Sequence, residues 1–108
     1  MVKVMLEYLS KIDKVRSINK RYHLNDRQAF ILDYICEKHL SHKGCRINEI
    51  ILLKTAGSPA TLHAVTKELT RLNLIKVSVD PVDNRMKNVL PSPLVLKRLK
   101  VLVTIFQK

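Results

Sequence analysis

The hydrophobic positions of this chain recur with two different periods, and the changes between them divide it into predicted elements. Up to about residue 75, apolar residues return every three or four positions, the spacing of one helix face. Over residues 75–79 they alternate instead, as in a half-buried β-strand. Helical spacing resumes at residue 94. The pattern predicts a mainly α-helical fold with one small β-hairpin.

Two helices are predicted before the middle of the chain. The first covers about residues 1–19, where an apolar stripe runs without glycine or proline. The second starts after Asn25, which with Gln28 can form the reciprocal bonds of a capping box, and continues toward Leu40. The stripe of the first helix must be buried, either on the rest of the domain or against a second copy of the chain.

The middle of the chain has the outline of a helix-turn-helix. Residues 45–47 are expected to be extended, and Asn48 to cap a brief helix over about residues 49–54. A glycine turn leads to a longer helix, which Ser58 caps and in which Pro59 takes the first position. Short helix, turn and longer capped helix are typical of this motif.

The longer helix is expected to have two unlike faces. Apolar residues at helical spacing form the predicted buried face: Leu62, Val65, Leu69 and Leu72. Small, hydroxyl-bearing and basic residues form the other: Pro59, Thr61, His63, Ala64, Thr66, Lys67, Thr70 and Arg71. Asn73 is expected to end the helix in the left-handed conformation. We interpret the element as a recognition helix for the DNA major groove, although on this stretch alone an ordinary surface helix fits as well.

A hairpin and a last helix complete the pattern. Turn residues 81–84 separate the alternating strand from a partner strand over residues 85–90, which Pro91 ends. Ser92 then caps a helix that runs nearly to the end of the chain. Its polar face is expected to consist of Lys97, Arg98, Lys100 and Lys108. A helix-turn-helix followed by a basic hairpin is a winged helix.

The net charge of the chain indicates which class of partner it binds. The 108 residues, taken as one domain, carry a formal net charge of +11, which attracts polyanions, nucleic acid before an anionic membrane. Aromatic residues make up only 5%, which disfavours single-strand binding by base stacking. There is neither an apolar run long enough to span a membrane nor a signal-peptide pattern. With only two cysteines, a cytoplasmic location is expected.

Chemistry other than binding finds little support. Cys36, His39, His42 and Cys45 have metal-capable side chains at regular spacing, but a site wrapped within ten residues would be unusually tight. A buried Cys36 with solvent-exposed histidines on a basic loop is the simpler expectation. Nearby lysines leave a redox-sensitive cysteine as a second option. No phosphate loop, nucleophile elbow or catalytic carboxylate pair is present. We therefore expect no enzyme activity, no metal and no cofactor.

Residues 24–92 resemble the MarR family of winged-helix transcription regulators. The segments that carry the resemblance are Leu24-Asn25-x-x-Gln28, Ile47-Asn48-Glu49-Ile50, Ser58-Pro59-Ala60-Thr61-Leu62, Leu72-Asn73-Leu74-Ile75, Asp80-Pro81-x-Asp83-x-Arg85 and Pro91-Ser92-Pro93. The resemblance implies a homodimer with intertwined terminal helices and a duplex DNA operator. It also implies that Arg85 enters the minor groove from the wing tip, which Asp83 orients.

These observations favour a dimeric, sequence-specific regulator that binds double-stranded DNA. Thr61 and His63 can contact base edges, and the basic residues after them can meet phosphates. The candidate DNA-binding residues are Ser58, Pro59, Thr61, His63, Lys67, Arg71, Arg85 and Lys87. The candidate dimerisation residues, within terminal helices at 1–20 and 93–108, are Met5, Leu9, Ile12, Leu99, Leu102 and Phe106. A winged-helix module for protein interaction or nonspecific nucleic-acid binding is the alternative, and any small-molecule effector stays open.

Overall fold

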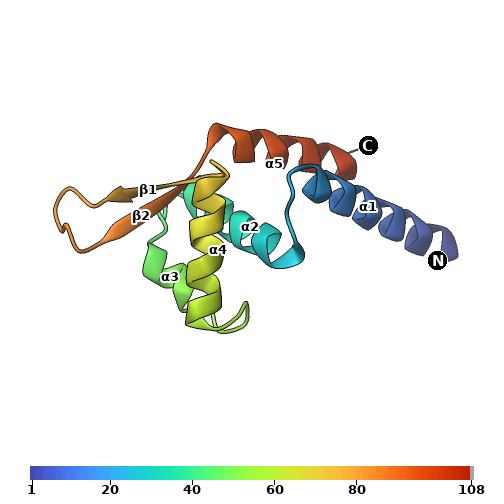
Figure 1. Ribbon diagram of the computed structural model, residues 1–108. Helices are drawn as coiled ribbons and strands as arrows, with labels where there is room; N and C mark the ends of the chain where they lie inside the picture. The colour runs from blue at the N-terminus through green and yellow to red at the C-terminus, as the bar shows by residue number, and fades with distance from the viewer. Residues whose placement is uncertain (108) are drawn as a thin grey trace.

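The computed structural model of the chain describes residues 1–107 (Figure 1). Five helices and two strands follow one another in the order α1 (Val2–Arg21), α2 (Asp26–Leu40), α3 (Ile47–Ile51), α4 (Pro59–Arg71), β1 (Ile75–Val79), β2 (Lys87–Pro91) and α5 (Pro93–Phe106). The predicted mainly helical winged fold is confirmed. Lys108, which was expected on the polar face of the last helix, lies outside the described residues.

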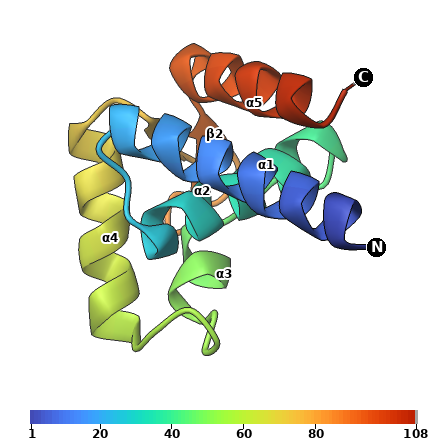
Figure 2. The same ribbon diagram turned by 90° about the vertical axis from the view of Figure 1, so that its right-hand side faces the viewer.

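The elements form an elongated molecule of about 53 × 26 × 23 Å. The hairpin of β1 and β2 extends from one end, and the N-terminal half of α1 projects from the other (Figure 1). Figure 2 shows α1 beside α5 and in front of α2, with α3 below them and α4 at the left of the view. Between residues 1 and 107, no helix is both long and apolar enough to cross a lipid bilayer.

One apolar core joins α2, α3, α4, the hairpin and the start of α5. Its buried members are Leu24, Ile31, Leu32, Ile35, Cys36, Cys45, Ile50, Leu62, Leu69, Leu74, Ile75, Val89 and Val95. The residues of α1 do not belong to this cluster, and the first ten residues of the chain are all exposed. The unit formed by α2, α3, α4 and the hairpin, which we call the reading head, is thus packed around its own core.

The predicted buried face of the helix-turn-helix is confirmed at Leu62 and Leu69, which are fully buried in α4. Thr66, expected on the exposed face, is buried instead. Its Oγ1 donates a hydrogen bond of 2.8 Å to the carbonyl oxygen of Leu62 one turn earlier, so its polar atom is satisfied without solvent. A short side chain with this bond can replace an apolar residue on a packed helix face.

The short helix α3 begins and ends earlier than predicted. Arg46, rather than Asn48, is its N-cap residue, and the Glu49 carboxylate accepts a bond from the Arg46 N–H. The expected extended segment before it exists as a single bridge between Arg46 and Asn88 of β2, and the Val89 N–H donates to the Cys45 carbonyl oxygen at 2.8 Å. This bridge holds the backbone extended up to Arg46, where the helix can start.

The hairpin is antiparallel, and β2 begins at Lys87, two residues later than predicted, because Arg85 and Met86 belong to the turn. The strand also includes Pro91, which was expected to end it. Ile75 pairs with Pro91, Val77 with Val89, and Val79 with Lys87. Burial declines along β1 from Ile75, which is in the core, to Val79, which is exposed. The base of the hairpin is therefore anchored in the reading head, while its tip extends into solvent (Figure 1).

Arg98 is the largest departure from the predicted α5. It was expected on the polar face, but its side chain is completely buried. It is hydrogen-bonded to Asn19 of α1 and paired with Asp33 of α2, whose own side chain is 56% exposed. A buried guanidinium needs such partners, because an unpaired charge in the interior is very costly.

Three helices end on a residue in the left-handed region, where glycine is the usual choice. The terminating residues are His23 after α1, His42 after α2 and Asn73 after α4, each with a φ near 60°. In each case two backbone N–H groups bond back into the last helical turn, the arrangement of a Schellman motif. The prediction for Asn73 is confirmed, whereas the two histidines were not foreseen.

His42→Gly is expected to raise the free energy of unfolding by roughly 0.5–1 kcal/mol, because glycine adopts φ near +60° without the steric cost that a Cβ imposes. His39→Gly is the matched control. It removes the same side chain from inside the last turn of α2 and is expected to lower stability by about 0.5–1 kcal/mol. Urea unfolding of both variants measures the difference, and an equal loss of stability in both would contradict the proposed role of the conformation.

Candidate nucleic-acid interface

The start of α4 is built by its cap and by the turn before it. The Ser58 side chain accepts a bond from the Thr61 N–H at 3.2 Å, and Pro59 occupies the first helical turn. Ahead of it, Gly57 has a φ of 153°, a conformation that L side chains rarely adopt. Arg27 of α2 donates from Nε to the Ala56 carbonyl oxygen at 2.8 Å. The turn is thus held from α2, a contact that the sequence did not indicate.

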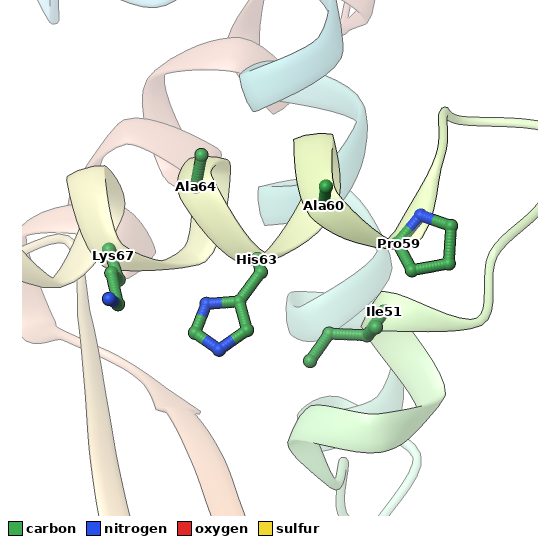
Figure 3. Close-up of a pocket in the computed structure, with 6 residues that line it drawn as sticks. All are labelled: Ile51, Pro59, Ala60, His63, Ala64 and Lys67. Atoms are coloured by element: carbon green, nitrogen blue, oxygen red, sulfur yellow. The ribbon is translucent and has the colours of Figure 1, made fainter.

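The exposed side of α4 carries mostly small side chains in its first two turns and basic side chains further along. Pro59, Ala60, His63, Ala64 and Lys67 line a hollow there together with Ile51 of α3. Figure 3 shows His63 and Lys67 projecting from the same side of the helix, with Ile51 beside His63. Small residues near the helix start allow a large partner to approach the backbone closely.

Two of the predicted contact residues on α4 already have partners within the chain. The Thr61 hydroxyl accepts a bond from the Ser58 hydroxyl at 2.9 Å, which leaves its hydrogen free to donate outward. Arg71 donates from Nε to the Glu68 carboxylate at 3.0 Å, and this bond lowers the pKa of Glu68. Its charge is thereby largely compensated. No carboxylate in the described part of the chain pairs with Lys67 in the same way.

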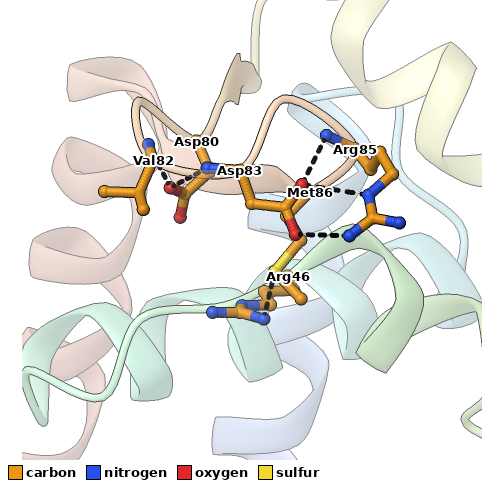
Figure 4. A network of polar contacts seen from close by, with 6 residues as sticks. All are labelled: Arg46, Asp80, Val82, Asp83, Arg85 and Met86. Atoms are coloured by element: carbon orange, nitrogen blue, oxygen red, sulfur yellow. Dashed lines mark hydrogen bonds and ion pairs between the residues drawn. The ribbon is translucent and has the colours of Figure 1, made fainter.

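Two aspartates give the wing tip a defined shape (Figure 4). The Asp80 carboxylate accepts bonds from the N–H groups of Val82 and Asp83 at 2.8 and 3.2 Å, and these bonds lower the pKa of Asp80. The Asp83 carboxylate accepts from the backbone N–H and the Nε of Arg85 at 3.0 and 3.2 Å. The Arg85 side chain stays 91% exposed while its direction is restrained by Asp83.

A groove connects α3, the exposed side of α4 and the wing. Its lining residues are Arg46, Ile47, Asn48, Glu49, Ile51, Leu52, His63, Arg85, Met86 and Lys87. Three predicted DNA contacts, His63, Arg85 and Lys87, therefore face one concave surface, although the wing residues lie more than twenty positions from the helix residue. Sequence reasoning missed Arg46 and Asn48, because only the bridge to β2 brings the start of α3 to this groove.

The predicted dimerisation residues fall into two groups. Met5, Leu9 and Phe106 are exposed, whereas Ile12 and Leu99 are half-buried. Leu102 is only 8% exposed, so packing within a single chain already covers it. The N-terminal half of α1 exposes further large apolar side chains, which are Val2, Val4, Leu6 and Tyr8. An uncovered apolar helix face of this length remains available to a partner.

The two cysteines lie in the core, where their thiols are poorly reactive. Burial raises the pKa of both Cys36 and Cys45 from 9.0 to about 11, with smaller contributions from Asp33 and Glu49. At neutral pH both are protonated thiols, which are poor nucleophiles, and this counts against the redox option. His39 and His42 lie exposed at the surface, and no group of metal-capable side chains gathers anywhere in residues 1–107.

The cysteines predict alkaline sensitivity. Because the folded chain holds the two thiol protons more tightly than the unfolded chain, the free energy of unfolding is expected to fall as pH rises from 9 toward 11. Urea midpoints across this range measure the effect. A Cys36→Ala/Cys45→Ala variant is expected to show a shallower decline, and an identical pH dependence in both proteins would refute the assignment.

Solved structures identify the fold. By sequence, no family model and no curated protein matches the chain. A structure of the S. aureus MepR–DNA complex has a TM-score of 0.71 and 22% identity, covering 96% of this chain and 79% of the other. A point mutant of S. aureus MepR bound to oligodeoxyribonucleotide gives 0.75 and 20%, covering 98% and 76%. MepR bound to ethidium bromide gives 0.72 and 21%, covering 98% and 75%. The chain has a MarR-like winged helix-turn-helix fold, the fold of MepR.

Proposed function

We propose that this chain is a dimeric transcription regulator that binds specific sites in duplex DNA and acts in the cytoplasm. The observation that carries the proposal is the shared groove, in which His63 of the recognition helix and Arg85 and Lys87 of the wing face the same side. MepR, which has the same fold, is described in complexes with DNA. This similarity supports duplex DNA as the ligand class.

In the proposed complex, α4 lies in the major groove. Ser58 and the free N–H groups of the first turn meet a phosphate, and Thr61 and His63 face base edges. Lys67 and Arg71 follow the backbone, with Lys67 the stronger contact because Glu68 offsets Arg71. Arg85 enters the minor groove, where a narrow A·T-rich segment has an enhanced negative potential. With few base-edge donors on α4, DNA shape contributes much of the specificity.

We also assign Arg46 and Asn48 to the proposed contact surface. Both line the groove between α4 and the wing, where a phosphate of the DNA backbone would pass. Together with a net charge of +11, these residues make binding strongly dependent on salt, because each neutralised phosphate releases a counterion.

The proposed dimer uses the uncovered face of α1 and the end of α5. Burying Met5, Leu9 and Phe106 against a second copy removes the exposed apolar surface from water. Two reading heads related by two-fold symmetry would then contact half-sites about 34 Å apart.

Met5→Glu/Leu9→Glu is expected to convert the dimer to a monomer at micromolar concentration, because it places two charges in the apolar contact. The matched control is Lys3→Gln/Lys14→Gln. It changes the net charge by the same amount on the opposite side of α1, and it should stay dimeric. Sedimentation equilibrium measures both variants, and a wild-type monomer at micromolar concentration would remove the dimer from the proposal.

Selection of bound sequences from random duplex DNA tests the function itself. We expect enrichment of a two-fold symmetric motif with half-sites about one helical turn apart. Failure to enrich any sequence, with binding retained, would favour the alternative of a nonspecific nucleic-acid-binding module, which the high charge and the few base-edge donors on α4 also fit.

A further inference from the structure

The side chain of Arg98 connects three helices at one point. Its Nε and Nη2 donate to Asn19 Oδ1 of α1 at 3.0 and 2.7 Å, and its Nη1 donates to Asp33 Oδ1 of α2 at 3.1 Å. Arg98 itself belongs to α5 and is 0% exposed. The terminal helices and the reading head therefore meet through one guanidinium.

Stability alone does not require a cation at this position. Val95 and Leu102, three residues before and four after Arg98 on the same face of α5, are both buried and apolar. Only the arginine of this pair is buried, because the Asp33 side chain is 56% exposed. An apolar residue in place of a buried cation is often neutral or stabilising, since the cation no longer has to be desolvated, and Asp33 would stay in contact with water. A guanidinium fork differs from an apolar side chain in that it binds its partners only in particular directions.

The attachment of α1 to the rest of the chain depends on few other contacts. Ile18 is the only buried residue of α1, and the helix contributes nothing to the main core. A second contact, Lys11 over the Phe106 ring at 5.7 Å, lies near the surface. Ile12 and Val15 of α1 are half-buried and line a hollow together with Leu99, Leu102 and Phe106 of α5, so they hold α1 against α5. Between α1 and α2, which belongs to the reading head, the side-chain contact through Arg98 is directional.

Asn19 is also the residue at which α1 turns toward α2. Its carbonyl oxygen accepts from the N–H groups of Tyr22 and Leu24 at 3.1 and 3.0 Å, within the motif that ends the helix. The backbone of Asn19 is thus held by the turn, while its side chain is held by Arg98. An orientation imposed there is passed directly to the whole helix.

We propose that Arg98 is a positioning residue that sets the angle between α1 and the reading head, and thereby the half-site spacing that the dimer accepts. The inference rests on the proposed function, because α1 carries the proposed dimer contacts. From Asn19 to Met5 the helix is about 21 Å long at 1.5 Å per residue. A change of about 10° at Asn19 moves Met5 by about 4 Å, close to the rise of about 3.4 Å per base pair.

The first test compares Arg98→Met with Lys97→Met, an exposed neighbour on α5 that loses the same charge. Binding is measured to the selected operator, to operators with the half-sites moved by one or two base pairs, and to an isolated half-site. Wild type and Lys97→Met should prefer the original spacing by about tenfold or more, since a misplaced half-site loses contacts worth over about 1.4 kcal/mol. Arg98→Met should prefer it by less than about threefold, with half-site affinity unchanged. Retention of the full preference in Arg98→Met would overturn the proposal.

The second test does not involve DNA and separates failure of the inference from failure of the proposed function. Spin labels at Lys3 on α1 and Thr55 in the reading head, attached by a cysteine-independent chemistry, report the distance between the two parts. A narrow distribution in wild type that broadens in Arg98→Met supports the role of Arg98 whether or not DNA is bound. Asn19→Ala removes the same contact from the side of α1 and should also broaden the distance distribution. This variant provides the test if Arg98→Met does not fold. Unchanged distributions would contradict the inference.

Discussion

Replacing Lys67 and Arg85 together by alanine is expected to weaken binding to duplex DNA by about 100-fold, roughly tenfold for each cation lost. Lys67 has no internal carboxylate partner among the described residues, and the Arg85 side chain is 91% exposed at the wing tip. Both charges are therefore available to the DNA backbone or the minor groove. The slope of log affinity against log salt should become less steep by about two, as two counterion-releasing contacts are lost.

Lys97→Ala/Lys100→Ala provides the matched control for this prediction. It removes two positive charges from exposed positions of α5, which Figure 1 places away from α3 and α4. Because long-range attraction is screened within about 10 Å at ordinary salt, the control should lose only about threefold or less. Fluorescence anisotropy titrations over a range of salt concentrations measure both. An equal loss in the two variants would mean that total charge, and not this surface, determines binding.

Ile50→Ala is expected to lower the free energy of unfolding by about 3 kcal/mol, because it leaves a cavity in the core of the reading head. Ile50 of α3 is 0% exposed and packs between the other core residues of α2, α4 and β2. A small domain has only about 5–15 kcal/mol of stability in total, so the variant should unfold at a much lower urea concentration.

Leu52→Ala is the control for this prediction, since Leu52 lies two positions further on and is 66% exposed. We expect a change within about 0.5 kcal/mol. Urea unfolding followed by circular dichroism compares the two variants directly. Similar losses at both positions would contradict the placement of α3 against the core.

Local signals in the sequence predicted the helix starts well. The Asn25–Gln28 box forms in both directions, and Ser58 and Ser92 cap α4 and α5 as expected. These interactions span three residues, so their geometry depends little on the rest of the fold. The start of α3 was misplaced because a distant strand determines it, through the bridge from Arg46 to Asn88.

Most contacts that join different elements could not be predicted from the sequence. Arg27 bonds a carbonyl oxygen 29 residues away, and Arg98 bonds partners 79 and 65 residues away. No periodicity pairs such positions. For Arg98 the sequence does contain one signal: at helical spacing it falls between Val95 and Leu102 on the apolar face of α5. A charged residue in that place indicates a buried partner.

The central claim is that the groove between α4 and the wing distinguishes one DNA sequence from others, and a competition experiment tests it most directly. The protein is bound to a labelled duplex selected from random sequence. Unlabelled selected duplex or unlabelled random duplex of equal length is then added in separate titrations at equal salt. The proposed regulator should require at least about 1,000-fold more random duplex to displace the bound site, as specific proteins do. A ratio near one would contradict sequence-specific recognition and leave a general polyanion-binding winged helix.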